Sequence, residues 1–298
     1  MLDTPLVSII IPTRNRPEEL VVCLQRLRAA AEDAADSNWE CLVVNDARTG
    51  SIHAGVELAN SSPHIRHLDG PGRGPAANRN AGAARAAGRW LIFLDDDCVP
   101  DPGFVKGYLD YIQAHPEARA LEGCTYPDRP AQSLAERGPF NEKGGCFYSC
   151  NIALRRDLFE EVGGFDEDYA FSLEDMDLYT RLLKKGEPLA FVPDASVMHP
   201  QKEGVGWGFF WSMQKGRRTY SQKHPDQARS YSCEQMWKIW LSGFFKGFLP
   251  DVVRFRGRGL APRLVYELLS LWAPLLLGAE RLMKRPNRVE AIPEPTQD

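Results

Sequence analysis

The chain has 298 residues, of which 43% are hydrophobic and 26% are charged. These fractions exclude a disordered chain, and the length is enough for one large domain or for a domain with an extension. The seven cysteines are odd in number and form no Cys-X-X-Cys pair, which argues against a disulfide framework and against a structural zinc site. Because no basic stretch precedes an apolar run at the N-terminus, we expect no secretory signal and a cytoplasmic protein with reduced thiols.

The formal net charge of −4 conceals two parts of opposite charge. Residues 1–199 contain 20 Lys and Arg against 31 Asp and Glu, whereas residues 200–288 contain 16 against 6. The acidic part and the basic part are therefore expected to have different roles.

Strand and helix patterns alternate along the first third of the chain. Short apolar runs predict strands at residues 6–12, 39–46, 64–68 and 90–94. The segments between them predict helices at residues 17–31, 52–60 and 75–88. This alternation predicts an α/β fold with a largely parallel sheet that helices cover on both faces.

Turns with polar residues follow three of the predicted strands. The residues of these turns are Pro12, Thr13 and Arg14 after the first strand, Asp46 after the second, and Asp95, Asp96 and Asp97 after the fourth. Ligands of parallel sheets bind beyond the carboxyl ends of the strands, so these residues are expected to line one crevice.

The three consecutive aspartates are the most informative of these residues. Their carboxylates repel one another unless a cation lies between them, and a hard divalent metal is the cation that carboxylates favour. In an extended chain Asp95 and Asp97 would share a face and converge on one ion, with Asp96 pointing elsewhere. A solvated acidic turn or a helix N-cap is the alternative interpretation.

A glycine-rich segment, Gly70–Pro75, precedes the alanine-rich helix predicted at 75–88. Helix N-termini with flexible backbone favour phosphate groups, and Arg73 and Arg79 add positive charge beside this one. The alternative is a plain surface loop. An acidic metal site next to a basic site is the combination that a metal-bound diphosphate requires.

Several short segments are weak signals one by one and become informative through their order and spacing. They are Val7-Ser-Ile-Ile-Ile-Pro-Thr-Arg-Asn-Arg-Pro, Val43-Val-Asn-Asp, Ala77-Asn-Arg-Asn-Ala-Gly, Phe93-Leu-Asp-Asp-Asp-Cys-Val-Pro, Val162-Gly-Gly-Phe-Asp and Leu173-Glu-Asp-Met-Asp-Leu. Together, over about residues 5–200, they resemble the family-2 glycosyltransferases of GT-A fold. The resemblance implies a mostly parallel central sheet flanked by helices, with a helical C-terminal extension.

The resemblance ends near residue 200, where the charge and composition also change, so the chain is expected to divide there. A catalytic domain would occupy residues 1–203, with a nucleotide-binding part at about 1–100 and an acceptor part at about 101–203. A basic, Trp-rich and mainly helical region with a polar tail would follow at residues 204–298.

The resemblance also implies which residues hold the nucleotide of the donor. Pro12, Thr13, Arg14 and Asp46 would contact the base, because the family uses the turn after the first strand and the carboxylate after the second for this purpose. Arg79 would lie near the diphosphate.

The aspartate triplet resembles the DxD element of the family. Asp95 or Asp96 would point toward the ribose, and Asp97 would bind a Mn²⁺ or Mg²⁺ ion that bridges the phosphates, with Asp95 and His199 as further metal ligands. A lone histidine is more often structural than a ligand, and the family pattern is what favours His199. Cys98 stands where relatives often have another acid, so which aspartate touches the metal stays open.

A second cluster of acids begins at Ser172. A helix with Ser172 as its N-cap and acids in its first turn would account for Glu174 and Asp177. The family resemblance implies that Asp175 is the general base that deprotonates the acceptor hydroxyl, a role that contributes about 10²–10⁴ in rate. The loop from Gly144 to Asn151 is expected to border the donor sugar.

These residues predict a metal-dependent inverting glycosyltransferase. It would move a sugar from a nucleotide-diphosphate donor, expected to be UDP-linked, to a hydroxyl of a glycan or lipid-linked acceptor in cell-envelope polysaccharide or glycolipid synthesis. A sugar-phosphate nucleotidyltransferase is one alternative, but it would have a glycine-rich loop where this chain has Pro12-Thr-Arg-Asn. A non-catalytic scaffold is the other alternative, and the intact Asp95, Asp97, Asp175 and His199 speak against it.

The basic C-terminal region contains two apolar stretches, at residues 236–249 and 264–283. Charged residues and a proline interrupt the second stretch, so it is too short to span a bilayer. Tryptophans and arginines around both stretches suit helices that lie on the inner face of the cell membrane, beside anionic lipid. The alternative is that these helices pack on the catalytic domain or on a second subunit of a homo-oligomer. No nucleic acid partner is expected, since no nucleic-acid module accompanies the basic residues.

Overall fold

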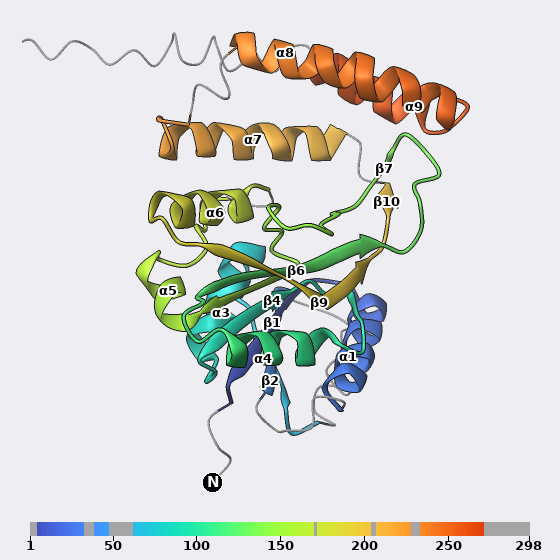
Figure 1. Cartoon of the computed structure of the whole chain (residues 1–298). Helices are drawn as coiled ribbons and strands as arrows, with labels where there is room; N and C mark the ends of the chain where they lie inside the picture. The colour runs from blue at the N-terminus through green and yellow to red at the C-terminus, as the bar shows by residue number, and fades with distance from the viewer. Residues whose placement is uncertain are drawn as a thin grey trace, which may run out of the picture.

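The computed structural model describes residues 5–32, 39–47, 62–169, 172–203, 207–227 and 233–270. The helix predicted at residues 52–60 and the part of the last apolar stretch beyond residue 270 lie outside these ranges. Within them the chain forms an eight-stranded sheet with helices on both faces, and a further group of helices follows at the C-terminal end (Figure 1). The predicted α/β fold with a helical C-terminal region is therefore confirmed.

The strands are β1 (Val7–Thr13), β2 (Trp39–Asn45), β3 (Ile65–Asp69), β4 (Trp90–Leu94), β5 (Val99–Pro100), β6 (Ala120–Pro127), β7 (Glu136–Arg137), β8 (Asn151–Arg155), β9 (Leu189–His199) and β10 (Lys202–Glu203). The helices are α1 (Pro17–Glu32), α3 (Pro75–Arg85), α4 (Phe104–Ala114), α5 (Arg156–Glu161), α6 (Glu174–Lys184), α7 (Trp207–Lys223), α8 (Cys233–Gly243), the π-helix η2 (Phe244–Phe248) and α9 (Leu249–Arg254). A last helical segment covers residues 260–270.

The order of the strands in the sheet is β3-β2-β1-β4-β8-β6-β9-β5. The strands β3, β2, β1 and β4 are parallel, β8 is antiparallel to both of its neighbours, and β6 and β9 are again parallel. The carboxyl ends of β1, β2 and β4 therefore open at one edge, where the sequence predicts a crevice. β7 and β10 form a separate two-stranded ribbon.

The predicted helix at residues 75–88 ends early, at Arg85. Ala86 is extended, with ψ of 145°, and its amide closes the helix on the carbonyl of Gly82. The chain then passes so close to β1 that a side chain at Gly88 would lie 2.6 Å from the amide nitrogen of Ser8. This close approach, and not continued helix, explains the glycine.

Two apolar clusters, one on each face of the sheet, form the core. On one face the helices α1 and α4 pack on β1, β2 and β4, with Leu20, Leu24, Leu27, Phe104, Tyr108, Ile9 and Ile11 buried. On the other face α3, α5 and α6 pack on the same sheet, with Ala76, Ala83, Leu158, Phe159, Leu178, Ile10 and Phe93 buried. Continuous apolar strands such as β1 are expected where both faces are covered.

The C-terminal region packs on the rest of the chain through α7, which lies over α6 (Figure 1). A side chain at Gly216 would lie 2.7 Å from the carbonyl oxygen of Ser172, so the two segments touch through backbone. The hydroxyl oxygens of Thr180 on α6 and Tyr220 on α7 are 2.7 Å apart and share a hydrogen bond. No helix in the described ranges has the length and apolar character needed to cross a membrane.

The carboxylate of Glu122 on β6 holds the loop before β8. Glu122 is buried, with 2% of its surface exposed. It accepts hydrogen bonds from the side-chain amide of Asn141 at 2.8 Å and from the main-chain amides of Cys146 at 3.1 Å and Phe147 at 2.8 Å. The amide of Gly145 is a further donor. This arrangement fixes the backbone of the loop that was expected to border the donor sugar.

Replacing Glu122 with glutamine should reduce the free energy of unfolding by about 2 kcal/mol, since hydrogen bonds to a charged group are lost and one amide donor would face another. Urea unfolding followed by circular dichroism measures the change. Glu117→Gln is the matched control, because the side chain of Glu117 is 75% exposed, and it should change stability by less than about 0.5 kcal/mol. Equal stability of the two variants would contradict the anchoring role of Glu122.

Candidate active site

A cleft of about 870 Å³ opens at the carboxyl edge of β1, β2 and β4. Its walls come from both halves of the domain and from α7. The predicted catalytic, donor-binding and metal-binding residues all line it, namely Pro12, Thr13, Arg14, Asp46, Arg79, Asp95, Asp96, Asp97, Asp175 and His199, whereas Arg73 does not. Their separate roles stay predictions, but the structure brings them to one place.

The aspartate triplet lies in a turn after β4, where the amide of Cys98 donates to the carbonyl of Asp95 at 3.1 Å. The predicted sharing of one face by Asp95 and Asp97 is wrong, because alternation of side chains holds for an extended strand and not for a turn. Asp95 pairs with Arg79 at 2.7 Å, whereas Asp96 and Asp97 both accept from Arg16 Nη1 at 3.0 Å. The triplet is therefore divided: Asp95 is tied to Arg79, and Asp96 and Asp97 are tied to Arg16.

Asp96 connects the triplet to the turn after β1. Its Oδ2 accepts from the hydroxyl of Thr13 at 2.8 Å, and its Oδ1 accepts from Arg16. Burial raises the pKa of Asp96 to about 6, against the opposing charge of Arg16. Both oxygens are thus engaged within the protein.

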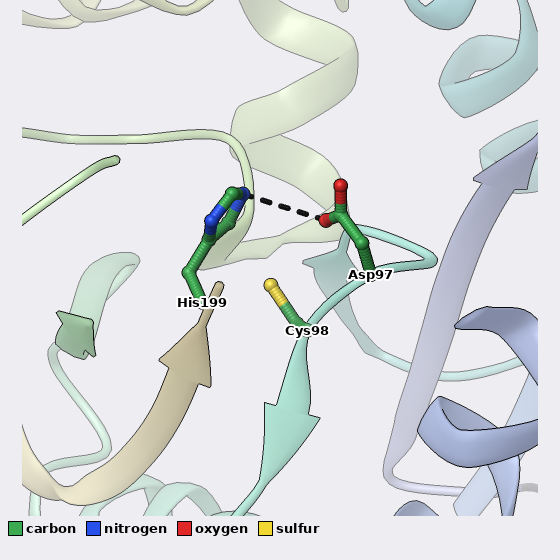
Figure 2. A group of neighbouring side chains, drawn as sticks. All are labelled: Asp97, Cys98 and His199. Carbon is green, nitrogen blue, oxygen red and sulfur yellow. Dashed lines mark ion pairs between the residues drawn. The ribbon is translucent and has the colours of Figure 1, made fainter. Parts of the chain in front are cut away.

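Asp97, Cys98 and His199 form a group whose ligand atoms all lie within 4.8 Å of one another (Figure 2). His199 is the last residue of β9, and β9 carries it to the aspartate turn. Its Nδ1 is 3.0 Å from the carbonyl of Pro200 and, as N–H, donates to it, so that Nε2 faces Asp97 Oδ1 at 3.4 Å.

The donor atoms of this group fit a divalent cation. Asp97 Oδ1 is buried and has no hydrogen-bond partner in the described part of the chain, whereas Oδ2 is bound by Arg16 and Lys202. Burial would raise the pKa of Asp97, but His199, Lys202 and Arg16 outweigh it and hold the pKa below its usual range. An ionised oxygen that accepts no hydrogen bond and lies 3.4 Å from an imidazole nitrogen is an arrangement that a metal ion would complete.

Cys98 is the weak member of the group. A hydrogen bond that its thiol makes with Cys150 and its complete burial raise the pKa of the thiol far above its usual value. A protonated thiol is a poor ligand for a hard cation. Asp97 and His199 are therefore the residues that would hold Mn²⁺ or Mg²⁺, and Asp95 is directed to Arg79 instead.

The first turn of α6 forms the opposite wall. Leu173, in the left-handed conformation with φ of 71°, is the N-cap residue before the helix, and no side chain caps the helix. The prediction that Ser172 is the N-cap is wrong, because its hydroxyl is hydrogen-bonded to that of Ser212 on α7 at 2.8 Å. Glu174 pairs with the buried Arg79 at 3.1 Å, so α6 is tied to the end of β4 through Arg79 and Asp95.

Asp175 lies beside Glu174 and lines the cleft. Desolvation, followed by the nearby charge of Glu174, raises the pKa of Asp175 to about 7, although the amide of Met176 donates to it at 2.7 Å. No side chain of the described ranges forms an ion pair with it. A carboxylate with a pKa near neutrality is poised to accept a proton.

Asp46 accepts hydrogen bonds from main-chain amides of the glycine-rich segment. It accepts from Gly72 N at 2.6 Å and from Gly74 N at 2.8 Å, while Arg73 pairs with Glu167 at 2.5 Å. The expectation that this segment offers its amides to a phosphate is therefore wrong for these two amides. The backbone conformation still needs glycine, since φ is 73° at Gly72 and 99° at Gly74.

The charged residues Arg16, Lys202 and Arg137 of the cleft were not predicted from the sequence. Arg16 binds two carboxylates of the triplet and Lys202 binds Asp97. Glu174, expected only as an acid of the first helical turn, neutralises Arg79. Arg16 lies in the segment after β1 and Lys202 three residues after His199, so proximity to selected residues was the available signal.

The sequence profile of glycosyl transferase family 2 matches residues 8–163. The chain is 30% identical over 193 residues to a glycosyltransferase of Haemophilus influenzae, which covers 60% of this chain and 63% of the relative. It is 25% identical over 291 residues to the validoxylamine A glucosyltransferase of Streptomyces hygroscopicus subsp. limoneus, which covers 84% of this chain and 63% of the relative. The chain thus spans less than two thirds of the length of these relatives.

A solved structure with a similar fold is the mannosyltransferase PcManGT from Pyrobaculum calidifontis in complex with GDP-Man and Mn²⁺. The TM-score is 0.59 at 20% identity, covering 95% of this chain and 88% of that one. The likeness confirms the predicted GT-A fold. Since the family profile extends over more than half of the sequence, the chain belongs to glycosyl transferase family 2.

Proposed function

We propose that this chain is a metal-dependent, inverting glycosyltransferase that moves a sugar from a nucleoside diphosphate donor to a hydroxyl of its acceptor. The observation that carries the proposal is the cleft itself. Asp175, a carboxylate able to accept a proton, and Asp97 and His199, which could together bind a metal ion, line the same cleft beside the turn after β1. Family membership and the GDP-Man and Mn²⁺ held by the solved neighbour support the same reading.

The reaction requires one proton acceptor and one stabilised leaving group. As the acceptor oxygen attacks the anomeric carbon, Asp175 takes its proton, and the bond from that carbon to the diphosphate breaks with its electron pair remaining on the phosphate oxygen. A single displacement of this kind inverts the anomeric centre. The cation, when bound, offsets the negative charge that develops on the diphosphate.

The residues of the nucleotide side position the donor. Pro12, Thr13, Arg14 and Asp46 are proposed to surround the base and Asp95 or Asp96 to approach the ribose, since all of them line the cleft. Asp46 holds the Gly72–Gly74 backbone and so shapes this wall as well. We expect a UDP-linked donor and include GDP in every test, because the solved neighbour binds GDP-Man.

Metal-dependent nucleotide binding tests the proposed donor site. UDP or GDP should raise the melting temperature of the intact protein in the presence of Mn²⁺ and much less in its absence. His199→Ala should weaken Mn²⁺ binding at least about tenfold, the loss typical of outer-shell partners. His115→Ala, an exposed histidine at the end of α4, is the control and should leave Mn²⁺ affinity unchanged. Indifference of the wild type to every nucleotide would favour a non-catalytic scaffold.

The pH dependence of transfer tests Asp175. Because a general base must be deprotonated, kcat/KM should fall about tenfold per pH unit below pH 7, where the carboxyl is protonated, and level off above it. Asp175→Asn should lower kcat by about 10²–10⁴ and leave nucleotide affinity unchanged, since the amide resembles the protonated acid. Asp110→Asn on α4, outside the cleft, should change neither quantity. Lost nucleotide affinity in Asp175→Asn would assign this residue to the donor site instead.

We also propose that the acceptor is lipid-linked and that the C-terminal helices touch an anionic membrane surface. Exposed apolar side chains on α8, η2 and α9 support this, with Ile239 58%, Phe245 61% and Val253 79% exposed. The surrounding region carries a large excess of Lys and Arg, which suits anionic headgroups.

Co-sedimentation with phosphatidylglycerol vesicles tests the membrane contact. The double variant Phe245→Ser and Val253→Ser should lose most of the binding, because about 25 cal/mol of transfer free energy is lost for each Å² of apolar surface removed. Leu183→Ser is the control, since this residue is 54% exposed on α6 and lies outside the C-terminal helices. Equal sedimentation of all three proteins would refute the contact.

A further inference from the structure

The β7–β10 ribbon beside the cleft separates its charges by face. Arg137 lies opposite Lys202 across the ribbon, and Glu136 lies opposite Glu203. Successive side chains of a strand point to opposite faces, and the two cations line the cleft whereas the two acids do not. Like charges directly opposite each other destabilise a strand pair. The cationic face therefore favours an anion in the cleft.

A carboxylate of the protein itself pairs with Lys202, whereas Arg137 forms no ion pair in the described part of the chain. Lys202 Nζ contacts Asp97. The acid next to Arg137 in sequence, Glu136, is bound by both terminal nitrogens of Arg129 at 2.9 Å. Among the described residues no carboxylate lies within 4.0 Å of a nitrogen of Arg137.

Further positive charge surrounds Arg137. The guanidinium carbons of Arg137 and Arg263 lie 5.2 and 5.8 Å from the ring centroid of Tyr266. Glu267, the acid beside them, is already paired with Arg263 at 2.7 Å. Arg137 is exposed as a residue, yet desolvation of its guanidinium group and the charges of Arg263 and Arg217 lower its pKa. Arg137 thus lies near two further guanidinium groups, and the nearby carboxylate of Glu267 is paired with Arg263.

The position of this cluster points to the acceptor and not to the donor. Phe209 and Met213 of α7 line the same side of the cleft, and Arg217 follows one turn later on the same face of the helix. The residues proposed to bind the nucleotide lie at the carboxyl ends of β1, β2 and β4. Arg137, Lys202, Phe209 and Met213 line the cleft from the β7–β10 ribbon and α7, which lie above the central sheet in Figure 1.

We propose that Arg137, supported by Arg217 and Arg263, binds a phosphoryl group of the acceptor. The inference rests on the proposed function and narrows its acceptor to a phosphate-bearing class. Guanidinium groups bind phosphate oxygens through paired hydrogen bonds, and a dianion would balance the charge that Glu267 leaves unmatched. The phosphoryl group belongs either to a lipid-linked sugar or to a soluble sugar phosphate, and the chemistry of recognition is the same.

The test uses the intact protein with its donor site filled by Mn²⁺ and the nucleoside diphosphate that binds it best. Geranyl diphosphate and inorganic pyrophosphate are then titrated by calorimetry. Arg137→Gln should weaken the binding of both probes about tenfold or more, since a charge-assisted contact is lost, and Arg137→Lys should recover part of the affinity. Arg26→Gln, an exposed arginine on α1 outside the cleft, is the matched control and should bind both probes as the wild type does.

The outcomes separate the two proposals. Tighter binding of geranyl diphosphate than of pyrophosphate identifies a lipid-linked acceptor, equal binding identifies a soluble one, and either supports the subsite if Arg137→Gln weakens it. The subsite is wrong if the wild type binds neither probe, or if Arg137→Gln binds both as the wild type does. It is also wrong if that variant loses nucleotide affinity and keeps probe affinity, because Arg137 would then belong to the donor site. A wild type that binds no nucleotide contradicts the proposed function itself.

Discussion

The geometry of the cleft depends on one buried ion-pair network, centred on Arg79. Its guanidinium binds Asp95 after β4 and Glu174 at the start of α6, and 2% of the residue is exposed. A buried charge that loses a partner is strongly destabilising, so the cost of separating these segments is high. Arg79 therefore fixes the distance between the nucleotide wall and the wall that carries Asp175, with the ring of Phe165 packed below it.

The carboxylates around this network differ in how they are compensated, and the difference gives each a separate chemistry. Asp97 is surrounded by basic groups and stays ionised, as the metal ligand proposed here would have to be. Asp175 has only hydrogen-bond donors and the more distant charge of Arg79, so burial raises its pKa to about 7. Environments that push the pKa values of neighbouring acids apart are how one cleft can provide both a cation site and a proton acceptor.

The sequence predicts the elements and the membership of the cleft well, for physical reasons that differ by residue. Apolar runs such as β1 are recognisable locally, and the rule that ligands bind at carboxyl ends places Thr13, Asp46 and Asp97 together. The errors concern which partner each polar group takes. Strand alternation does not apply to Asp95 in its turn, and the hydroxyl of Ser172 meets a residue 40 positions away.

The same limit explains the arginines and lysines that were overlooked. Arg16, Lys202 and Arg137 have long side chains that reach partners set by tertiary structure, and no local pattern records where their charged ends lie. The opposite character of the two faces of the β7–β10 ribbon depends on a pairing between residues 136–137 and 202–203. Such pairings are properties of the folded chain.

Glu122 has one more consequence. It holds its loop almost entirely through main-chain amides, so the backbone path is independent of the side chains that the loop presents to the cleft. Substitution at Cys146 would alter the lining of the cleft, where the donor sugar is proposed to lie, without loosening the scaffold beneath it. A fixed frame with interchangeable contacts is a ready starting point for engineering this enzyme family toward new donor sugars.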